Sequence, residues 1–270
     1  MEKFLETLAL RAFIITTNQL LNGTVLTTRR DSMITYIQLK QVARNRRFVI
    51  FTILFPIVWY WMMVELINVS SNTKYQLSIL VLALLIGILG NSIVTFSKRI
   101  ASNRSFYFLQ SKISQYSIWK YLVSQLITQL VLNLVITAVL VITACLLNTF
   151  SFDSLTWIIL GVVNLFGIYV SIIGFTLGII FDRVAIDAGA TPLMFLLAMF
   201  IVPWNIFLPA SSMVRFMTRI QKLFPSYYAY QIIQQNSHLL KNLSIFTVSF
   251  VLTLIPFLLI IAVRLIRNNN

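Results

Sequence analysis

Long apolar segments recur along this chain, and each is close to the length that crosses a lipid bilayer. A hydrocarbon core of about 30 Å needs roughly 20 mostly apolar residues wound as a helix. The segments span residues 48–66, 77–96, 121–147, 155–181, 191–210 and 243–265, and the fifth has the shortest apolar run. Irregular backbone facing lipid would leave hydrogen-bonding groups unpaired. We therefore predict an all-α polytopic membrane protein with six transmembrane helices.

Composition supports the same class. Only 10% of the 270 residues are charged and 59% are hydrophobic, whereas a soluble domain carries about 25% charged residues to solvate its surface. The outer face of the folded chain must therefore contact lipid. The net charge of +14 does not indicate a nucleic-acid partner, because Lys and Arg flank apolar spans, where cytoplasmic loops and anionic membrane lipids account for them.

The distribution of Lys and Arg predicts which side of the membrane each loop faces. Residues 97–120 carry five basic residues and no acidic residue, whereas the loops at 67–76 and 148–154 carry only Lys74 between them. Cytoplasmic loops are enriched in Lys and Arg. Both ends of the chain are therefore predicted inside the cell, and 97–120 is predicted to be the largest cytoplasmic loop, where a soluble partner would act.

The N-terminal part of the chain divides at about Met33. Residues 1–32 mix apolar and charged positions, and we assign them no role. Residues 33–47 read as an amphipathic helix on the cytoplasmic headgroups that ends in a basic cluster, although a simple positive-inside flank gives the same pattern. The cluster consists of Arg44, Arg46 and Arg47. Residues 33–270 are predicted to form a single transmembrane domain.

Two of the predicted spans carry patterns that indicate helix packing. The third has polar residues four apart, on one helical face that should contact protein or a water-filled path. They are Gln125, Gln129, Asn133 and Thr137. Hydrogen bonding between helices and a place on a substrate pathway or dimer face remain open. The fourth span carries Gly174 and Gly178 four residues apart, a spacing that lets another helix approach closely.

Prolines interrupt the chain before the last span. Pro203, Pro209 and Pro225 break helices in a stretch that also carries basic residues on the predicted outer side. Because proline removes a backbone donor, such a stretch persists at membrane depth only when protein covers it or when it lines a cavity. We expect a short pair of re-entrant or interfacial helices there, and a kink near Pro256 in the sixth span.

Catalytic and metal-binding patterns are missing. His238 is the only histidine, and no G-x-x-x-x-G-K-[ST] phosphate loop occurs, so neither a histidine-based site nor nucleotide hydrolysis has the residues it needs. Glu65 is the only acidic residue inside a predicted span, at its outer end, whereas ion-coupled carriers use intramembrane carboxylates. We therefore predict no catalytic residue, metal or cofactor in this chain, and an energy source outside it.

The order of these features resembles the membrane subunit of type-2 ATP-binding-cassette (ABC) exporters. The resemblance covers about residue 33 to the end and includes the loop RIASNRSFYFLQSKISQYSIWK and the stretches FIVPWNIFLP and LFPSYYAYQIIQ. In the last stretch Pro225, Tyr228 and Gln234 match the family pattern, whereas Ser226 stands where an apolar residue or Thr is usual. The loop lacks the acidic residue that many members have before Arg104, which leaves a particular charge pair with the ATPase in doubt.

The resemblance implies partners and roles for named residues. It implies a second permease subunit, the same or homologous, and two copies of a cytoplasmic ABC ATPase that hold the ATP and magnesium. The ATPase-coupling residues would be Arg99, Ile100, Arg104, Phe106, Tyr107, Phe108, Leu109, Asp182 and Arg183. The outer gate region would be Pro203, Pro209, Pro225, Tyr227 and Tyr228. Closure of the ATPases would shift these elements and open a path outward.

The expected function is export across a bacterial plasma membrane, with the chain as a multi-pass subunit. An amphipathic or hydrophobic substrate, such as an antimicrobial peptide or a drug, suits a compact subunit without a large outer domain. Export of a lipid-linked glycan or polymer by the same family is one alternative. A non-transporting membrane protein that confers immunity or acts as a scaffold is another, from a different class.

Overall fold

The computed structural model describes residues 54–67, 73–114, 118–147, 153–234 and 238–269, all within one compact unit, Asn45–Asn270. These residues form helices joined by short turns, without a strand. The predicted amphipathic helix at 33–47, with Arg44, Arg46 and Arg47, lies outside the described residues. So do residues 1–32 and the first part of the predicted span at 48–66.

The described helices include five that are long and apolar enough to cross a membrane: Tyr75–Ser105, Tyr121–Leu146, Ser154–Ile180, Arg183–Ile201 and Leu239–Arg264. The elements are α3 (Phe55–Ile67), α4 (Thr73–Leu89), η2 (Gly90–Phe96), α5 (Ser97–Ser114), α6 (Ile118–Leu146), α7 (Ser154–Ile180), α8 (Arg183–Ile201), α9 (Trp204–Phe207), α10 (Ser212–Gln221), α11 (Pro225–Gln234) and α12 (Leu239–Asn269). The all-helical prediction is confirmed, whereas the count of six spans and their orientation stay predictions.

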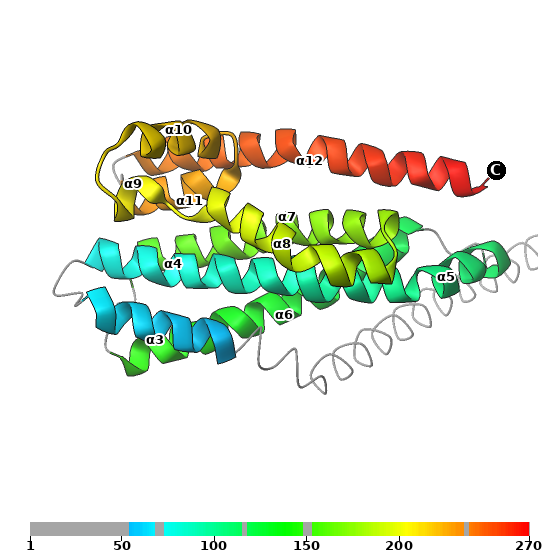
Figure 1. Ribbon diagram of the computed structural model, residues 1–270, viewed down its shortest axis with the longest axis horizontal. Helices are drawn as coiled ribbons and strands as arrows, with labels where there is room; N and C mark the ends of the chain where they lie inside the picture. Colours follow the sequence, from blue (N-terminus) through cyan, green and yellow to red (C-terminus); the bar gives the residue numbers. More distant parts are fainter. Residues whose placement is uncertain (1–53, 68–72, 115–117, 148–152, 235–237, 270) are drawn as a thin grey trace, which may run out of the picture. The chain divides into compact units, whose positions relative to one another are not determined.

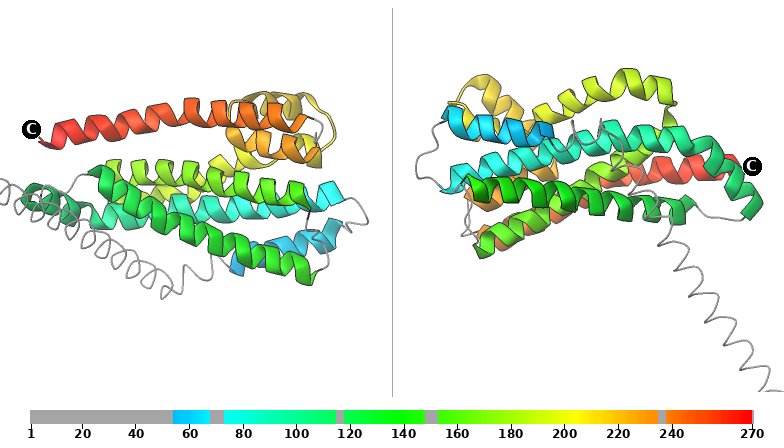
Figure 2. Two further views of the ribbon diagram at one scale, coloured as in Figure 1. Left: turned by 180° about the vertical axis from the view of Figure 1, so that it is seen from behind. Right: turned by 90° about the horizontal axis from the view of Figure 1, so that it is seen from below.

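Helix α7 is the centre of the packing. It contacts α4, α6, α5 and η2 along its length, and α11 and α12 cover another side (Figures 1 and 2). A Cβ on Gly174 would collide with the backbone carbonyl of Ser92, and one on Gly178 would lie 2.6 Å from the carbonyl oxygen of Ser97. The sequence prediction that these glycines admit a close helix neighbour is confirmed, and the neighbour is the helix formed by η2 and α5.

Helices α4, η2 and α5 follow one another without a break from Thr73 to Ser114. Residues 97–114 of the predicted cytoplasmic loop therefore continue the preceding span as helix, and their place in the cytoplasm stays a prediction. Basic residues reveal which side a segment faces but not its conformation, and Arg and Lys are good helix formers. No Gly or Pro occurs between Ser97 and Ser114 to end the helix. The middle segment η2 is a π-helix, in which Asn91 and Ser92 are buried.

Helix α8 begins at Arg183, so the predicted turn over residues 182–190 and the predicted span start at Thr191 were wrong. The Asp182 side chain accepts a hydrogen bond of 2.8 Å from the backbone N–H of Ala185 and caps the helix. Such an Asp cap satisfies one of the N–H groups that a helix start leaves free. Pro192 lies inside α8 rather than at its beginning.

The proline-rich stretch forms three short helices where a pair was predicted, and their place in the membrane interface stays a prediction. Pro203 precedes the four residues of α9, Pro209 lies between α9 and α10, and Pro225 is the first residue of α11. The first helical position tolerates proline because its N–H has no partner within the helix. The side chain of Gln221 on α10 donates to the carbonyl oxygens of Met199 and Val202, at 3.3 and 2.5 Å, and so joins α10 to the end of α8.

Candidate functional site

The structure joins the two segments that the sequence assigned to ATPase coupling. Arg104 on α5 donates through one guanidinium nitrogen to the carbonyl oxygens of Ile179, Ile180 and Phe181, at 2.8, 3.3 and 3.4 Å. The last carbonyls of a helix lack partners within it and carry partial negative charge, so a cation stabilises them. Arg104 therefore fastens α5 to the end of α7. We call α5, the turn at 181–182 and the first turn of α8 the coupling junction.

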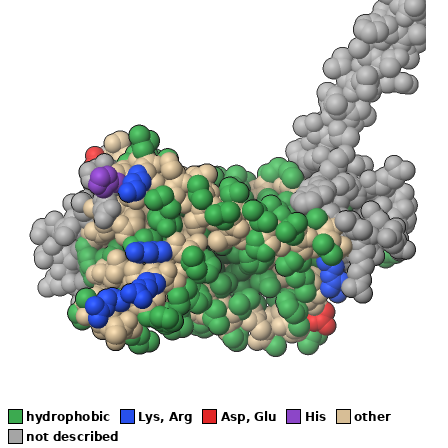
Figure 3. All heavy atoms as spheres, turned by 90° about the horizontal axis from the view of Figure 1, so that it is seen from above, with side chains coloured by type: hydrophobic (Ala, Val, Ile, Leu, Met, Phe, Trp, Pro, Cys, Tyr) green, Lys and Arg blue, Asp and Glu red, His purple; other side chains and the backbone are tan. Residues whose placement is uncertain are grey.

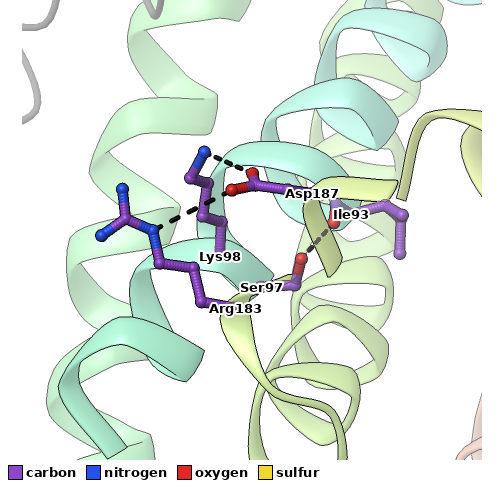
Figure 4. A network of polar contacts seen from close by, with 5 residues as sticks. All are labelled: Ile93, Ser97, Lys98, Arg183 and Asp187. Carbon is purple, nitrogen blue, oxygen red and sulfur yellow. Dashed lines mark hydrogen bonds and ion pairs between the residues drawn. The ribbon is translucent and has the colours of Figure 1, made fainter. Parts of the chain in front are cut away.

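An ion pair forms a second link in the coupling junction. Lys98 on α5 pairs with Asp187 on α8, and Arg183 approaches the other oxygen of the same carboxylate at 3.9 Å (Figure 4). Next to it, Ser97 donates to the carbonyl oxygen of Ile93 within the helix. Sequence reasoning missed Lys98 and Asp187. They lie far apart in the chain, so no local spacing could have paired them.

Two of the residues predicted to couple to the ATPase are buried. Ile100 is 1% exposed and Tyr107 is 4% exposed, and the Tyr107 ring stacks on that of Tyr121 with centroids 4.1 Å apart. These side chains pack α5 against the rest of the chain, and their predicted role in ATPase coupling stays a prediction. Leu109, by contrast, is 62% exposed. The side chains of Phe106 and Phe108 lie outside the described ones.

Arg99 also points into the protein rather than toward a partner. Its guanidinium lies over the Phe96 ring, 5.0 Å from the centroid, and donates to the side-chain oxygen of Gln129 at 3.4 Å. Its Nε is buried without a hydrogen-bond partner. Among the described residues no carboxylate pairs with this cation. The predicted role of Arg99 in contacting the ATPase therefore does not match its position.

The polar stripe of the third predicted span faces the interior of the same subunit. Gln125, Gln129, Asn133 and Thr137 are all less than 10% exposed. Asn91 on η2 donates to Asn133 at 3.1 Å, and Asn164 on α7 donates to Thr137 at 3.3 Å. These contacts favour hydrogen bonding between helices over a face toward a second subunit.

The stripe continues through the centre of the packing as a connected set of polar groups. Gln129 donates to Ser92 at 3.5 Å, and Ser92 and Ser171 lie 3.2 Å apart. Ser171 also donates to the carbonyl oxygen of Gly167 at 2.6 Å. Through Arg99 and Gln129, these groups reach from the coupling junction to the middle of α7. We call this set the polar column.

The predicted outer gate region lies at the opposite end of the unit, around α9, α10 and α11 (Figure 1). Pro203 and Pro225 are buried, whereas Pro209 is exposed. The rings of Tyr227 and Tyr228 meet edge to face at 5.3 Å, and the Tyr228 hydroxyl donates to the Lys222 carbonyl at 2.9 Å. Burial, and then the neighbouring Tyr228, raises the pKa of Tyr227, so this phenol is neutral at physiological pH.

No group of three or more His, Cys, Asp or Glu side chains suited to a metal occurs in the part of the chain that the structure describes. His238 is exposed, and Cys145 is a free thiol. The candidate site that remains lies in the contacts between helices. It consists of the coupling junction and the polar column that connects it to the centre of the packing.

The ion pair of the coupling junction gives a first prediction. Lys98→Gln and Asp187→Asn should each lower the free energy of unfolding by about 0.2–1 kcal/mol, the range for partly exposed pairs. The double substitution should cost no more than the larger single one, because both remove one interaction. Thermal unfolding of the purified chain measures this. Arg183→Gln is the control. The Arg183 nitrogen lies 3.9 Å from the Asp187 carboxylate, too far for a hydrogen bond, so this substitution should change the stability less than Lys98→Gln does. If the double substitution lowered the free energy of unfolding by the sum of the two single losses, Lys98 and Asp187 would not interact.

One curated protein matches the chain over most of its length. It is "Putative transport permease YvfS" of Bacillus subtilis (strain 168), 23% identical over 215 residues, which cover 77% of this chain and 87% of that protein. No protein-family profile and no solved structure matches the chain. The likeness supports the resemblance to permease subunits of ABC-2 type transporters. With its five apolar helices, the chain is a multi-pass membrane protein.

Proposed function

We propose that this chain is the membrane subunit of an ATP-driven ABC-2 exporter, with ATP hydrolysis in a separate ATPase chain. The observation that carries the proposal is the unbroken helix from Thr73 to Ser114. It crosses the candidate membrane region and then continues into α5, which is fastened to the ends of both α7 and α8. A force on α5 therefore reaches three candidate spans at once.

The proposed mechanism is alternating access driven by the ATPases. Two ATPase subunits would close on ATP against two permease subunits, the same or homologous, and move each coupling junction. The closed ATPase pair acts as a ligand of the permease, and a ligand shifts an equilibrium between two conformations only by its difference in affinity for them. Closed ATPases would thus favour the outward-open state. This mechanism requires the coupling junction on the cytoplasmic side, which is the orientation that the Lys and Arg distribution predicts.

Two exposed apolar side chains in the coupling junction are the best candidates for ATPase contact. Val184 at the start of α8 is 77% exposed and adjoins the exposed Asp182 and Arg183, and Leu109 near the end of α5 is 62% exposed. Buried apolar anchors within a polar rim dominate the free energy of most interfaces. These residues replace Ile100, Tyr107 and Arg99 as the proposed contacts.

Co-purification with a cognate ABC ATPase tests the proposal. Val184→Asp and Leu109→Asp should each reduce the recovered ATPase roughly tenfold, because a lost anchor is worth about 1.4 kcal/mol or more. Leu240→Asp is the matched control, since Leu240 is as exposed as Val184, at 77%, but lies in the first turn of α12, at the other end of the unit. Unchanged recovery with both variants would remove the proposed contact surface.

A transport assay in reconstituted vesicles tests the proposed substrate. The proposed substrate is an amphipathic or hydrophobic compound such as an antimicrobial peptide or a drug. ATP-dependent movement of such a compound by the reconstituted subunit and ATPase is the expected result. Failure to recruit any ABC ATPase from the chain's own genome would rule out the exporter and leave an immunity or scaffold protein. Movement of a lipid-linked glycan would keep the exporter and change its substrate.

A further inference from the structure

Basic side chains gather on α10, at the end of the unit opposite α5 (Figures 1 and 3). Arg215, Arg219 and Lys222 recur at spacings of four and three residues, so they share one side of the helix. They border a half-open pocket of about 280 Å³, whose lining also includes Asn205, Thr218 and the apolar residues Leu208, Ala210 and Val214. A water molecule takes about 30 Å³ of liquid volume, so the pocket holds several waters or an anion.

No carboxylate of the described residues forms an ion pair with the cations of this pocket. No Asp or Glu follows Asp187 in the sequence, and the ion pairs of the described residues both use Asp187, with Lys98 and Arg183. Like charges that neighbour one another on a helix repel. An anion from outside the described chain would relieve the repulsion among all three cations.

Helix α10 also has an exposed apolar side. Met213 is 66% exposed, Phe216 59% and Leu223, just past the helix, 66%, whereas Val214 and Gln221 face the protein. The helix thus has a buried row, a basic row and an exposed apolar row. A helix with this pattern lies in the membrane interface, where its apolar row enters the acyl region and its basic row lies at the depth of the phosphates.

We propose that the pocket binds the phosphate group of an anionic phospholipid. Arg215 and Arg219 would hold phosphate oxygens with paired N–H donors, and Lys222 would add a point charge. Because Gln221 joins α10 to the carbonyls at the end of α8, the bound lipid would hold α9 and α10 against α8. With the coupling junction in the cytoplasm, as proposed above, this lipid belongs to the outer leaflet.

Lipid retention by the full chain tests the proposal. The chain is purified in neutral detergent with equal amounts of phosphatidylglycerol and phosphatidylcholine, and retained lipid is counted by native mass spectrometry. The wild type should retain phosphatidylglycerol preferentially, and R215Q/R219Q should bind it roughly tenfold more weakly. R215K/R219K, which keeps both charges, should retain most of the binding. Lys241→Gln is the control, because Lys241 is exposed on α12 and does not line the pocket.

A second measurement uses the wild-type chain and does not need the substitutions at Arg215 and Arg219. Trp204 on α9 precedes Asn205 of the pocket lining, so brominated phosphatidylglycerol should quench its fluorescence more than brominated phosphatidylcholine does. Trp204→Phe should abolish the difference. Equal quenching by the two lipids, or equal lipid retention by wild type and R215Q/R219Q, would overturn the proposal. Displacement of the lipid by millimolar inorganic phosphate would show a site for the free ion and overturn the lipid assignment.

Discussion

Gly174→Ala should unfold the protein at a markedly lower temperature than the wild type. A Cβ at this position collides with the backbone carbonyl of Ser92 on η2, and backbone cannot move aside as a side chain can. Overpacked cores lose about 1–3 kcal/mol, occasionally more, and we expect the upper end here. At roughly 2–4 °C for each kcal/mol, the midpoint of thermal unfolding should fall by about 6–12 °C.

Gly161→Ala is the matched control for this substitution. Gly161 lies on the same helix α7, and a Cβ there meets no atom within 4 Å. Since alanine favours the helix over glycine by about 1 kcal/mol, Gly161→Ala should leave the midpoint unchanged or raise it. Equal midpoints for Gly174→Ala and Gly161→Ala would show that α7 does not contact η2 as closely as described.

Arg99→Met should stabilise the fold and weaken transport. A buried cation opposes folding when no carboxylate pairs with it, and none of the described carboxylates pairs with Arg99. Replacing buried ionic groups by packed apolar ones is often neutral or stabilising by 1–4 kcal/mol. Met fills similar space beside the Phe96 ring and favours contact with aromatic groups. We expect a higher unfolding midpoint. We also expect substrate-dependent ATP hydrolysis of the assembled transporter to fall about tenfold or more, because ionisable groups within membrane spans are retained mainly for function.

Lys98→Met separates the effect of Arg99 from the effect of removing any cation from α5. Lys98 is about one-third exposed and pairs with Asp187, so its loss should slightly lower stability. Arg104→Met removes the contacts with the end of α7 and should lower it more. Loss of stability in Arg99→Met would show that the guanidinium holds the polar column together rather than serving transport.

The long spans, the close helix contact at Gly174 and Gly178, and the short helices after Pro203 could be predicted from the sequence, because each follows from local composition and spacing. The continuity of the helix through residue 97 was missed because charge was read as a sign of a loop. The start of α8 was missed because Asp182 was not recognised as a helix cap, although an Asp before a helical run is a known signal.

The site residues divide in the same way. The polar residues of the third predicted span were recognised by their spacing, but only the fold shows that their partners are Asn91, Ser92 and Asn164. Arg99 and Arg104 are equally basic in the sequence, yet one lies beside an aromatic ring and the other at a helix end. Packing decides which side of a basic helix faces inward, and composition alone does not predict that side.

The π-helical segment η2 sits between the candidate span and α5. Each of its hydrogen bonds reaches one residue further than in an α-helix, so the segment takes up about one extra residue of chain. Rewinding it as α-helix would release that residue as roughly 1.5 Å of travel and about 100° of rotation. In the proposed exporter, a force on α5 would therefore rotate the helix as well as move it along its axis.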